Sequence, residues 1–112
     1  CAVVNVKATL DSGKRIQAWS YRNVSQSILG QRGWLPPGAI DSQAVEGSIH
    51  LPYALGTKVV EWVPLPVRIP VGFWRSVGSS INAFAVECML DELARLRQLG
   101  VDDAYLRRLL SQ

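Results

Sequence analysis

The segment at residues 72–80 carries the side chains best suited to hold a ligand. Two glycines bracket an aromatic pair and Arg75, and the segment runs directly into the expected start of a helix. Unpaired backbone amides and the helix dipole at such a start favour an anion or an oxygen-rich ligand, and the Arg75 guanidinium adds a permanent charge. The same residues fit equally well a capped helix after an aromatic plug, with Phe73 and Trp74 in the core and Arg75 on the surface.

The other reactive side chains form no recognisable catalytic or metal-binding pattern. His50 is the single histidine, and nothing in the sequence places a serine or cysteine beside it, so we interpret it as structural or exposed. Cys1 and Cys88 show neither zinc spacing nor a CxxC motif, and Cys88 lies in an apolar helical pattern that predicts a buried free thiol. Helix charge and capping explain the acidic pairs at 91–92 and 102–103. We therefore assign no catalytic residue and no metal ligand.

Alternation of apolar and polar residues predicts a β-hairpin at the start of the chain. Residues 2–10 alternate with a period of two, and residues 15–21 do so again after a turn. In this second strand, one face is expected to carry Ile16, Ala18 and Ser20, and the other face Gln17, Trp19 and Tyr21. A third strand is expected at 57–63, and the prolines that follow it prevent regular pairing beyond that point.

Apolar residues at helical spacing predict a long helix at 80–99, with Ser79 or Ser80 as its N-cap. A short C-terminal helix is expected to follow and to end at Leu110. Residues 22–48 are interrupted by glycines and prolines and are expected to form one long irregular loop. The sequence thus predicts an α+β fold, in which a small antiparallel sheet of the hairpin and the third strand is packed by the long helix and the short C-terminal helix.

The composition is that of one small globular domain. The chain has 112 residues, of which 48% are hydrophobic and 19% charged, so we treat residues 1–112 as a single module. The sequence contains 12 Lys and Arg residues and nine Asp and Glu residues. Because the basic residues form no run, we expect no nucleic-acid binding. No apolar stretch approaches the roughly 20 residues that span a bilayer, so no membrane segment is expected.

A resemblance to a known family is carried by the sequences GFWRSVGSSINAFAVE at 72–87 and LDELA at 90–94. They resemble the molybdenum-binding large subunit of the xanthine dehydrogenase and aldehyde oxidase superfamily, and in particular its isoquinoline 1-oxidoreductase beta subunit branch. Weaker similarity extends over nearly the whole chain. The resemblance implies that the chain is one segment of the molybdenum-cofactor domain of a larger subunit.

The resemblance further implies an oxidoreductase that hydroxylates aromatic N-heterocycles or oxidises aldehydes, with water as the oxygen source. Its cofactor would be molybdopterin cytosine dinucleotide, positioned through Trp74, Arg75, Ser76 and Gly78, with the Arg75 backbone amide as the expected contact to a cofactor oxygen. Val77 would border the substrate, where a valine offers little area for ring stacking. We expect no cofactor to stay tightly bound to the isolated segment.

The partners implied by the resemblance are the remainder of the large subunit and a 2Fe–2S small subunit, in the periplasm or the cytoplasm of a bacterium. The general-base glutamate of the family belongs to a Gly-x-Gly-Glu stretch that does not occur in this sequence, so the chain alone is expected to be inactive. The alternative function is a non-catalytic binding or assembly module derived from such a domain. That module would hold a partner chain through the same loop and through exposed apolar faces.

Overall fold

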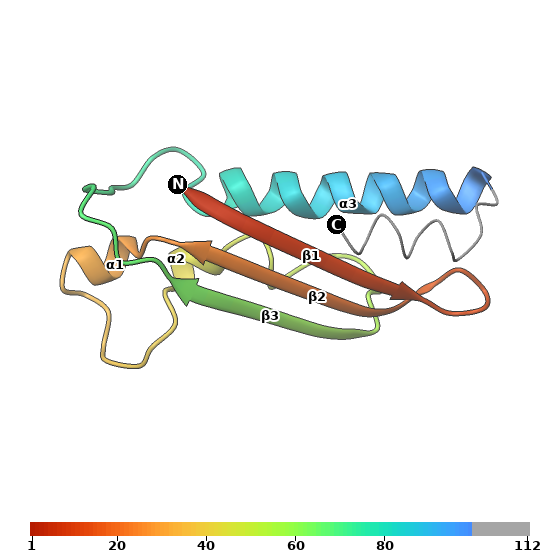
Figure 1. Cartoon of the computed structure of the whole chain (residues 1–112), viewed down its shortest axis with the longest axis horizontal. Helices are drawn as coiled ribbons and strands as arrows, with labels where there is room; N and C mark the ends of the chain where they lie inside the picture. Colours follow the sequence, from red (N-terminus) through yellow and green to blue (C-terminus); the bar gives the residue numbers. More distant parts are fainter. Residues whose placement is uncertain (100–112) are drawn as a thin grey trace.

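The computed structural model describes residues 1–99, in which three strands form one sheet and a long helix covers one of its faces (Figure 1). In chain order the elements are β1 (Ala2–Leu10), β2 (Ile16–Ser25), α1 (Ile28–Gln31), α2 (Ser42–Val45), β3 (Thr57–Pro64) and α3 (Ser79–Leu99). The α+β class predicted from the sequence is confirmed. The expected C-terminal helix lies outside the described residues.

The sheet is mixed, with the strand order β1-β2-β3. β1 and β2 form the expected antiparallel hairpin, whereas β3 runs parallel to β2, with Ala18 opposite Thr57 and Ser25 opposite Pro64. The prediction of an antiparallel sheet is therefore wrong for the third strand. Parallel neighbours need a crossover of about a dozen residues or more, and residues 26–56 supply it by returning the chain to the end of the sheet where β2 begins.

A β-bulge places Ile16 on the same face of β2 as Trp19. The register shifts between Thr9 and Leu10 of β1, so that Gln17 is an extra residue on β2. One extra residue reverses the alternation of side chains between the two faces. Ile16 and Trp19 therefore pack into the same core, although simple alternation places them on opposite sides of the strand.

Residues 22–48 are not one irregular loop, contrary to the prediction. β2 continues to Ser25, and two short helices follow because polar side chains supply their N-caps. Ser27 Oγ accepts a hydrogen bond of 2.7 Å from an amide of α1, and Asp41 accepts one of 2.9 Å from the Gln43 amide of α2. The buried Asp41 carboxylate also accepts from the Ser27 hydroxyl at 2.6 Å, so the two caps are joined.

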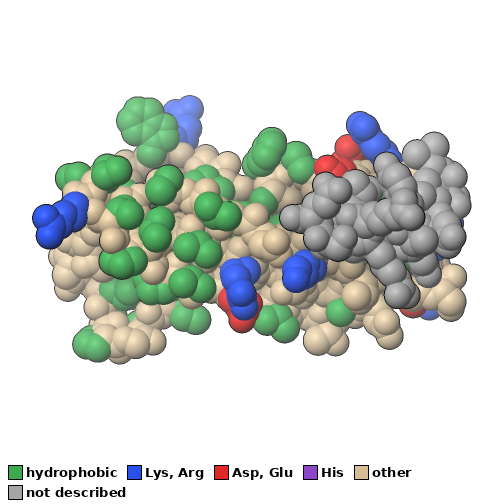
Figure 2. Space-filling model, in the orientation of Figure 1, with side chains coloured by type: hydrophobic (Ala, Val, Ile, Leu, Met, Phe, Trp, Pro, Cys, Tyr) green, Lys and Arg blue, Asp and Glu red, His purple; other side chains and the backbone are tan. Residues whose placement is uncertain are grey.

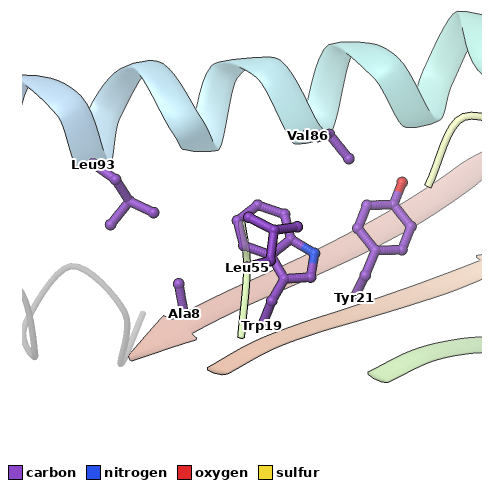
Figure 3. Close-up of a cluster of buried hydrophobic side chains, with 6 residues drawn as sticks. All are labelled: Ala8, Trp19, Tyr21, Leu55, Val86 and Leu93. Atoms are coloured by element: carbon purple, nitrogen blue, oxygen red, sulfur yellow. The ribbon is translucent and has the colours of Figure 1, made fainter. Parts of the chain in front are cut away.

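The core lies between the sheet and α3 (Figure 3). Trp19 and Tyr21 project from β2 toward the helix, where Val86 and Leu93 face them, as the apolar spacing of the helix predicts. Cys88 is exposed, so the prediction of a buried thiol is wrong. The reason is geometric: Cys88 lies two positions after Val86 and therefore on the other side of the helix.

Candidate functional site

The 72–80 loop turns immediately before α3, which begins at Ser79. Ser76 and Val77 have φ angles of 66° and 39°. This left-handed region is uncommon for residues with a side chain, above all for a β-branched valine, and such backbone strain is found most often at functional sites. The loop is therefore held in a conformation that the sequence of residues 76 and 77 alone does not favour.

The aromatic residues of the loop lie on the surface. Trp74 is 85% exposed, and Phe73 and Arg75 are exposed as well. Phe73 stacks against Trp34 with 6.5 Å between ring centroids, and the Arg32 guanidinium carbon lies 5.4 and 5.5 Å from the two ring centres. The interpretation of residues 73 and 74 as a plug packed in the core is therefore wrong.

The backbone amides around the start of α3 are only partly used by the chain itself. The amides of Ile81 and Asn82 donate to the Gly78 carbonyl at 3.2 and 3.0 Å, and the Val77 amide donates to the Trp74 carbonyl at 3.1 Å. Within residues 1–99 no acceptor takes the amides of Arg75, Ser76, Gly78 and Ser79. These four donors remain free to meet the oxygen atoms of a ligand.

Gly78 occupies the position before the first helical residue, where a serine cap was expected. The Ser80 hydroxyl donates to the Val77 carbonyl at 2.6 Å instead of accepting an amide, so the N-cap prediction is wrong for Ser80, and α3 already includes Ser79. A Cβ atom on residue 78 would collide with the carbonyl oxygen of Gln43. Glycine is required at this position because the loop packs closely against the backbone of α2.

A pocket of about 190 Å³ opens beside the 72–80 loop, and we call it the loop pocket. Trp74, Val77 and Gly78 line it, whereas Arg75 and Ser76 do not. The structure therefore brings three of the five predicted site residues together at one cavity, whereas Arg75 and Ser76 are exposed and do not line it.

A buried network centred on Asn82 forms part of the pocket wall. Asn82 Nδ2 donates to the carbonyls of Ala44 and Glu46, both at 2.8 Å. Asn82 Oδ1 accepts from the Tyr21 hydroxyl at 2.7 Å and from Asn23 Nδ2 at 3.0 Å. All four hydrogen-bonding positions of this amide are used, and they join α3 to β2 and to the chain around α2.

The network also fixes the orientation of Asn23, which is 2% exposed. Its Nδ2 donates to the Ala44 carbonyl at 2.8 Å and to Asn82 Oδ1. A rotated amide would place the Asn23 oxygen against these two acceptors, so Oδ1 points away from them. Among the described residues this buried oxygen has no donor, which is unusual in a folded protein, and Asn23 also lines the loop pocket.

The stability of the protein should fall at high pH because of Tyr21. Burial raises the pKa of Tyr21 to about 12, so the folded state keeps this proton at a pH where the unfolded state has lost it. The contribution of Tyr21 to the free energy of unfolding is complete below about pH 10. We expect the free energy of unfolding to decline by about 2 kcal/mol as the pH approaches 12. Urea unfolding at each pH measures it. Tyr21→Phe should remove most of the decline. Tyr53→Phe should keep most of it, because Tyr53 is exposed and its pKa is raised mainly by the hydrogen bond to Glu87; an equal decline in both variants would contradict the assignment.

Asn23 and Asn82 were not among the predicted site residues, although the sequence holds a signal for each. Asn23 continues the period-two series that begins with Trp19 and Tyr21 on the buried face of β2. Asn82 lies four positions before Val86 and therefore on the inner face of α3. A polar residue at a buried position needs a hydrogen-bonding partner, so both positions could have been marked as parts of one network.

The other candidates from the sequence form no cluster within residues 1–99, and the acidic pair at 102–103 lies outside the described residues. His50 is exposed, and nowhere in residues 1–99 do three His, Cys, Asp or Glu side chains gather closely enough to hold a metal ion. Of the helices in this part of the chain, none combines the length and the apolar character needed to cross a membrane. Comparisons of the chain with family models, with curated proteins and with solved structures found no significant match.

Proposed function

We propose that this chain is a segment of the large subunit of a molybdenum hydroxylase, and that its 72–80 loop helps to position a molybdopterin cofactor. The resemblance of residues 72–94 to that family supports the proposal. The structural observation that carries it is the group of four backbone amides at residues 75, 76, 78 and 79 that have no acceptor within residues 1–99. Amides at a helix start favour an anionic oxygen, and the resemblance implies such a contact at Arg75.

The loop fits one part of molybdopterin cytosine dinucleotide and not all of it. The loop pocket, at about 190 Å³, is smaller than the roughly 300 Å³ from which small-molecule sites usually start, so most of the cofactor would lie outside it. The free amides would hold an oxygen atom, the exposed Arg75 guanidinium would attract its negative charge, and Trp74 would lie beside it. When bound, the cofactor supplies the molybdenum centre for hydroxylation of an N-heterocycle or oxidation of an aldehyde.

In this proposal the chain's own residues bind and orient. Backbone donors that are fixed in advance stabilise developing charge best where water is excluded, and the close packing of Gly78 against the Gln43 backbone holds this end of the loop in place. Val77 would border the substrate, in keeping with its place on the wall of the loop pocket. Removal of the substrate proton and of the electrons would belong to the remainder of the large subunit and to a 2Fe–2S small subunit.

A titration with the cofactor tests the proposal. A large excess of molybdopterin cytosine dinucleotide should raise the melting temperature, because a ligand that binds only the folded state stabilises that state. Arg75→Gln should weaken the affinity roughly tenfold, since it removes a cationic donor beside the free amides. Arg68→Gln removes the same charge at an exposed position outside the loop and should leave the affinity unchanged. An unchanged melting temperature, or equal losses in the two variants, would refute the site.

A second function, a non-catalytic binding or assembly module, is favoured by the apolar surface. Hydrophobic side chains gather at the end of the molecule that carries the 72–80 loop (Figure 2). Exposed members on the elements at this end are Val63, Ile69, Phe73, Trp74 and Ile81. Large apolar patches of this kind mark interfaces. Metal and pterin analysis of the protein from its natural source separates the two functions: molybdenum and pterin in amounts equal to the chain support the hydroxylase, and a stable partner chain without either supports the module.

A further inference from the structure

A second cavity lies at the other end of the molecule from the 72–80 loop, where the turn of the β1–β2 hairpin approaches the later turns of α3 (Figure 1). We call it the hairpin cavity. Its volume is about 720 Å³, which is within the range of roughly 300–1,000 Å³ typical of small-molecule sites. No residue of the 72–80 loop lines it, so an inference drawn from it does not depend on the proposed cofactor site.

The inner part of the hairpin cavity is apolar. Leu55 and Leu93 line it, and because they belong to the core and are only 4% and 6% exposed, they form its deepest part (Figure 3). Leu10, Ile16 and Leu90 are half-buried and extend this aliphatic wall. Burial of apolar area is favourable whatever the shape of the ligand, so the wall suits a flexible hydrocarbon chain.

The rim of the hairpin cavity is positively charged. Lys14, Arg15 and Arg97 line it and are exposed, whereas no acidic side chain of the described residues lines it. Arg15 is paired with Asp11 at 3.2 Å, but Lys14 and Arg97 take part in no ion pair within residues 1–99. An anionic group at this rim would gain the attraction of two cations while it stays in contact with water, so it would avoid the cost of burying a charge.

The basic rim and the aliphatic interior together select the class of ligand. The volume is several times the roughly 150 Å³ that holds a benzene molecule, so a chain of about eight to ten carbon atoms fits. The Glu87 carboxylate accepts hydrogen bonds of 2.9 and 2.8 Å from the Tyr53 hydroxyl and does not line the cavity. We infer that the hairpin cavity binds the anion of a medium-chain fatty acid, with its carboxylate at Lys14 and Arg97 and its chain in the interior.

Octanoate and octan-1-ol are the probes that test the charge preference. They have the same number of carbon atoms, but only octanoate is an anion at pH 7. Calorimetric titration of the full chain at low salt should show that octanoate binds about fivefold more tightly, the difference expected for two exposed ion pairs. A purely apolar surface would instead favour the alcohol, which loses its water more easily. Equal affinities, a preference for octanol, or no binding of octanoate to the full chain would overturn the inference.

Decanoate tests the apolar interior. Two additional CH₂ groups should raise the affinity about 5- to 15-fold over that of octanoate if they enter the cavity. Equal affinities of the two acids would mean that the chain stays in water, which would overturn the inference.

Two double variants test the role of the rim. Lys14→Gln combined with Arg97→Gln should remove the preference for octanoate over octanol. Lys7→Gln combined with Arg68→Gln lowers the net charge by the same amount at exposed positions outside the cavity and should keep the preference. Equal losses in the two proteins would mean that net charge alone attracts the anion, which would overturn the assignment to this cavity.

A pair of tryptophan substitutions on α3 tests the location. Ala94 and Cys88 are both exposed, but only Ala94 lines the hairpin cavity. Ala94→Trp should fill part of the cavity and weaken octanoate at least about tenfold, whereas Cys88→Trp should leave its affinity unchanged. Unaltered binding in Ala94→Trp, or equal losses in both variants, would overturn the inference. Arg75→Gln should weaken the cofactor and not octanoate, so failure of either site is distinguishable from failure of the other.

Discussion

Asn82→Asp will lower the free energy of unfolding by about 4 kcal/mol at neutral pH, the size expected for a buried charge without a partner. The Asn82 side chain is fully buried, and its Nδ2 donates to the carbonyls of Ala44 and Glu46. An aspartate would lose both donors and would place a negative charge against these two oxygen atoms. Because domains of this size are stable by only about 5–15 kcal/mol, the loss would leave little stability.

Urea unfolding at pH 7 measures this effect, with Asn5→Asp as the matched control. Asn5 is exposed on β1, so the same chemical change there should alter the free energy of unfolding by less than about 0.5 kcal/mol. The Asn82→Asp protein should also regain stability as the pH falls, because protonation removes the buried charge. A loss below about 1 kcal/mol at pH 7 would show that the network contributes little to the fold.

Gly78→Ala will lower the free energy of unfolding by about 2 to 3 kcal/mol, the range of strongly overpacked sites. The new Cβ atom would collide with the backbone carbonyl of Gln43, which cannot move aside as a flexible side chain could. Either the start of α3 or the chain at α2 must shift. The collision would move the 72–80 loop away from Gln43 and Ala44, which line the loop pocket together with it.

Gly72→Ala is the control for this change, since it introduces the same methyl group at the other end of the loop. The nearest atom to a Cβ there is an Arg32 side-chain nitrogen at 3.5 Å, an ordinary contact. Thermal and urea unfolding of the two variants should therefore differ clearly, and equal stabilities would argue against the close packing at Gly78. A loss of ligand binding in a Gly78 variant reports on the fold as well as on the site, which makes Arg75→Gln the better probe of the cofactor.

The parts of the fold that depend on local patterns could be predicted from the sequence. The alternation in residues 2–10 and the apolar spacing of α3 correspond to the observed strand and to the inner face of the helix. The direction of β3 could not, because a short apolar strand pairs equally well in either orientation and only the path of residues 26–56 decides between them. The bulge at Gln17 was equally hidden, since it depends on pairing with β1 and not on the residue itself.

The candidate site was predictable in part for the same reason. Glycines and a helix start marked the 72–80 loop, and the structure places a pocket there. The network of Asn23 and Asn82 joins residues that are 59 positions apart, and no local pattern reveals such a contact. The exposure of Trp74 was also not predictable, since a tryptophan that directly follows Phe73 in the sequence fits a core equally well.

The parallel pairing of β2 with β3 sets an order in which the sheet assembles. Leu10 meets Ile16 across a tight turn, whereas Ala18 meets Thr57 only after a long stretch of chain has been closed into a loop. Closing the longer loop loses more conformational entropy, and such distant contacts slow folding. We therefore expect the hairpin to form before β3 docks. In that interval the unpaired side of β2 is an open edge on which a strand of another molecule can add, which makes this step the point at which the chain is most prone to aggregate.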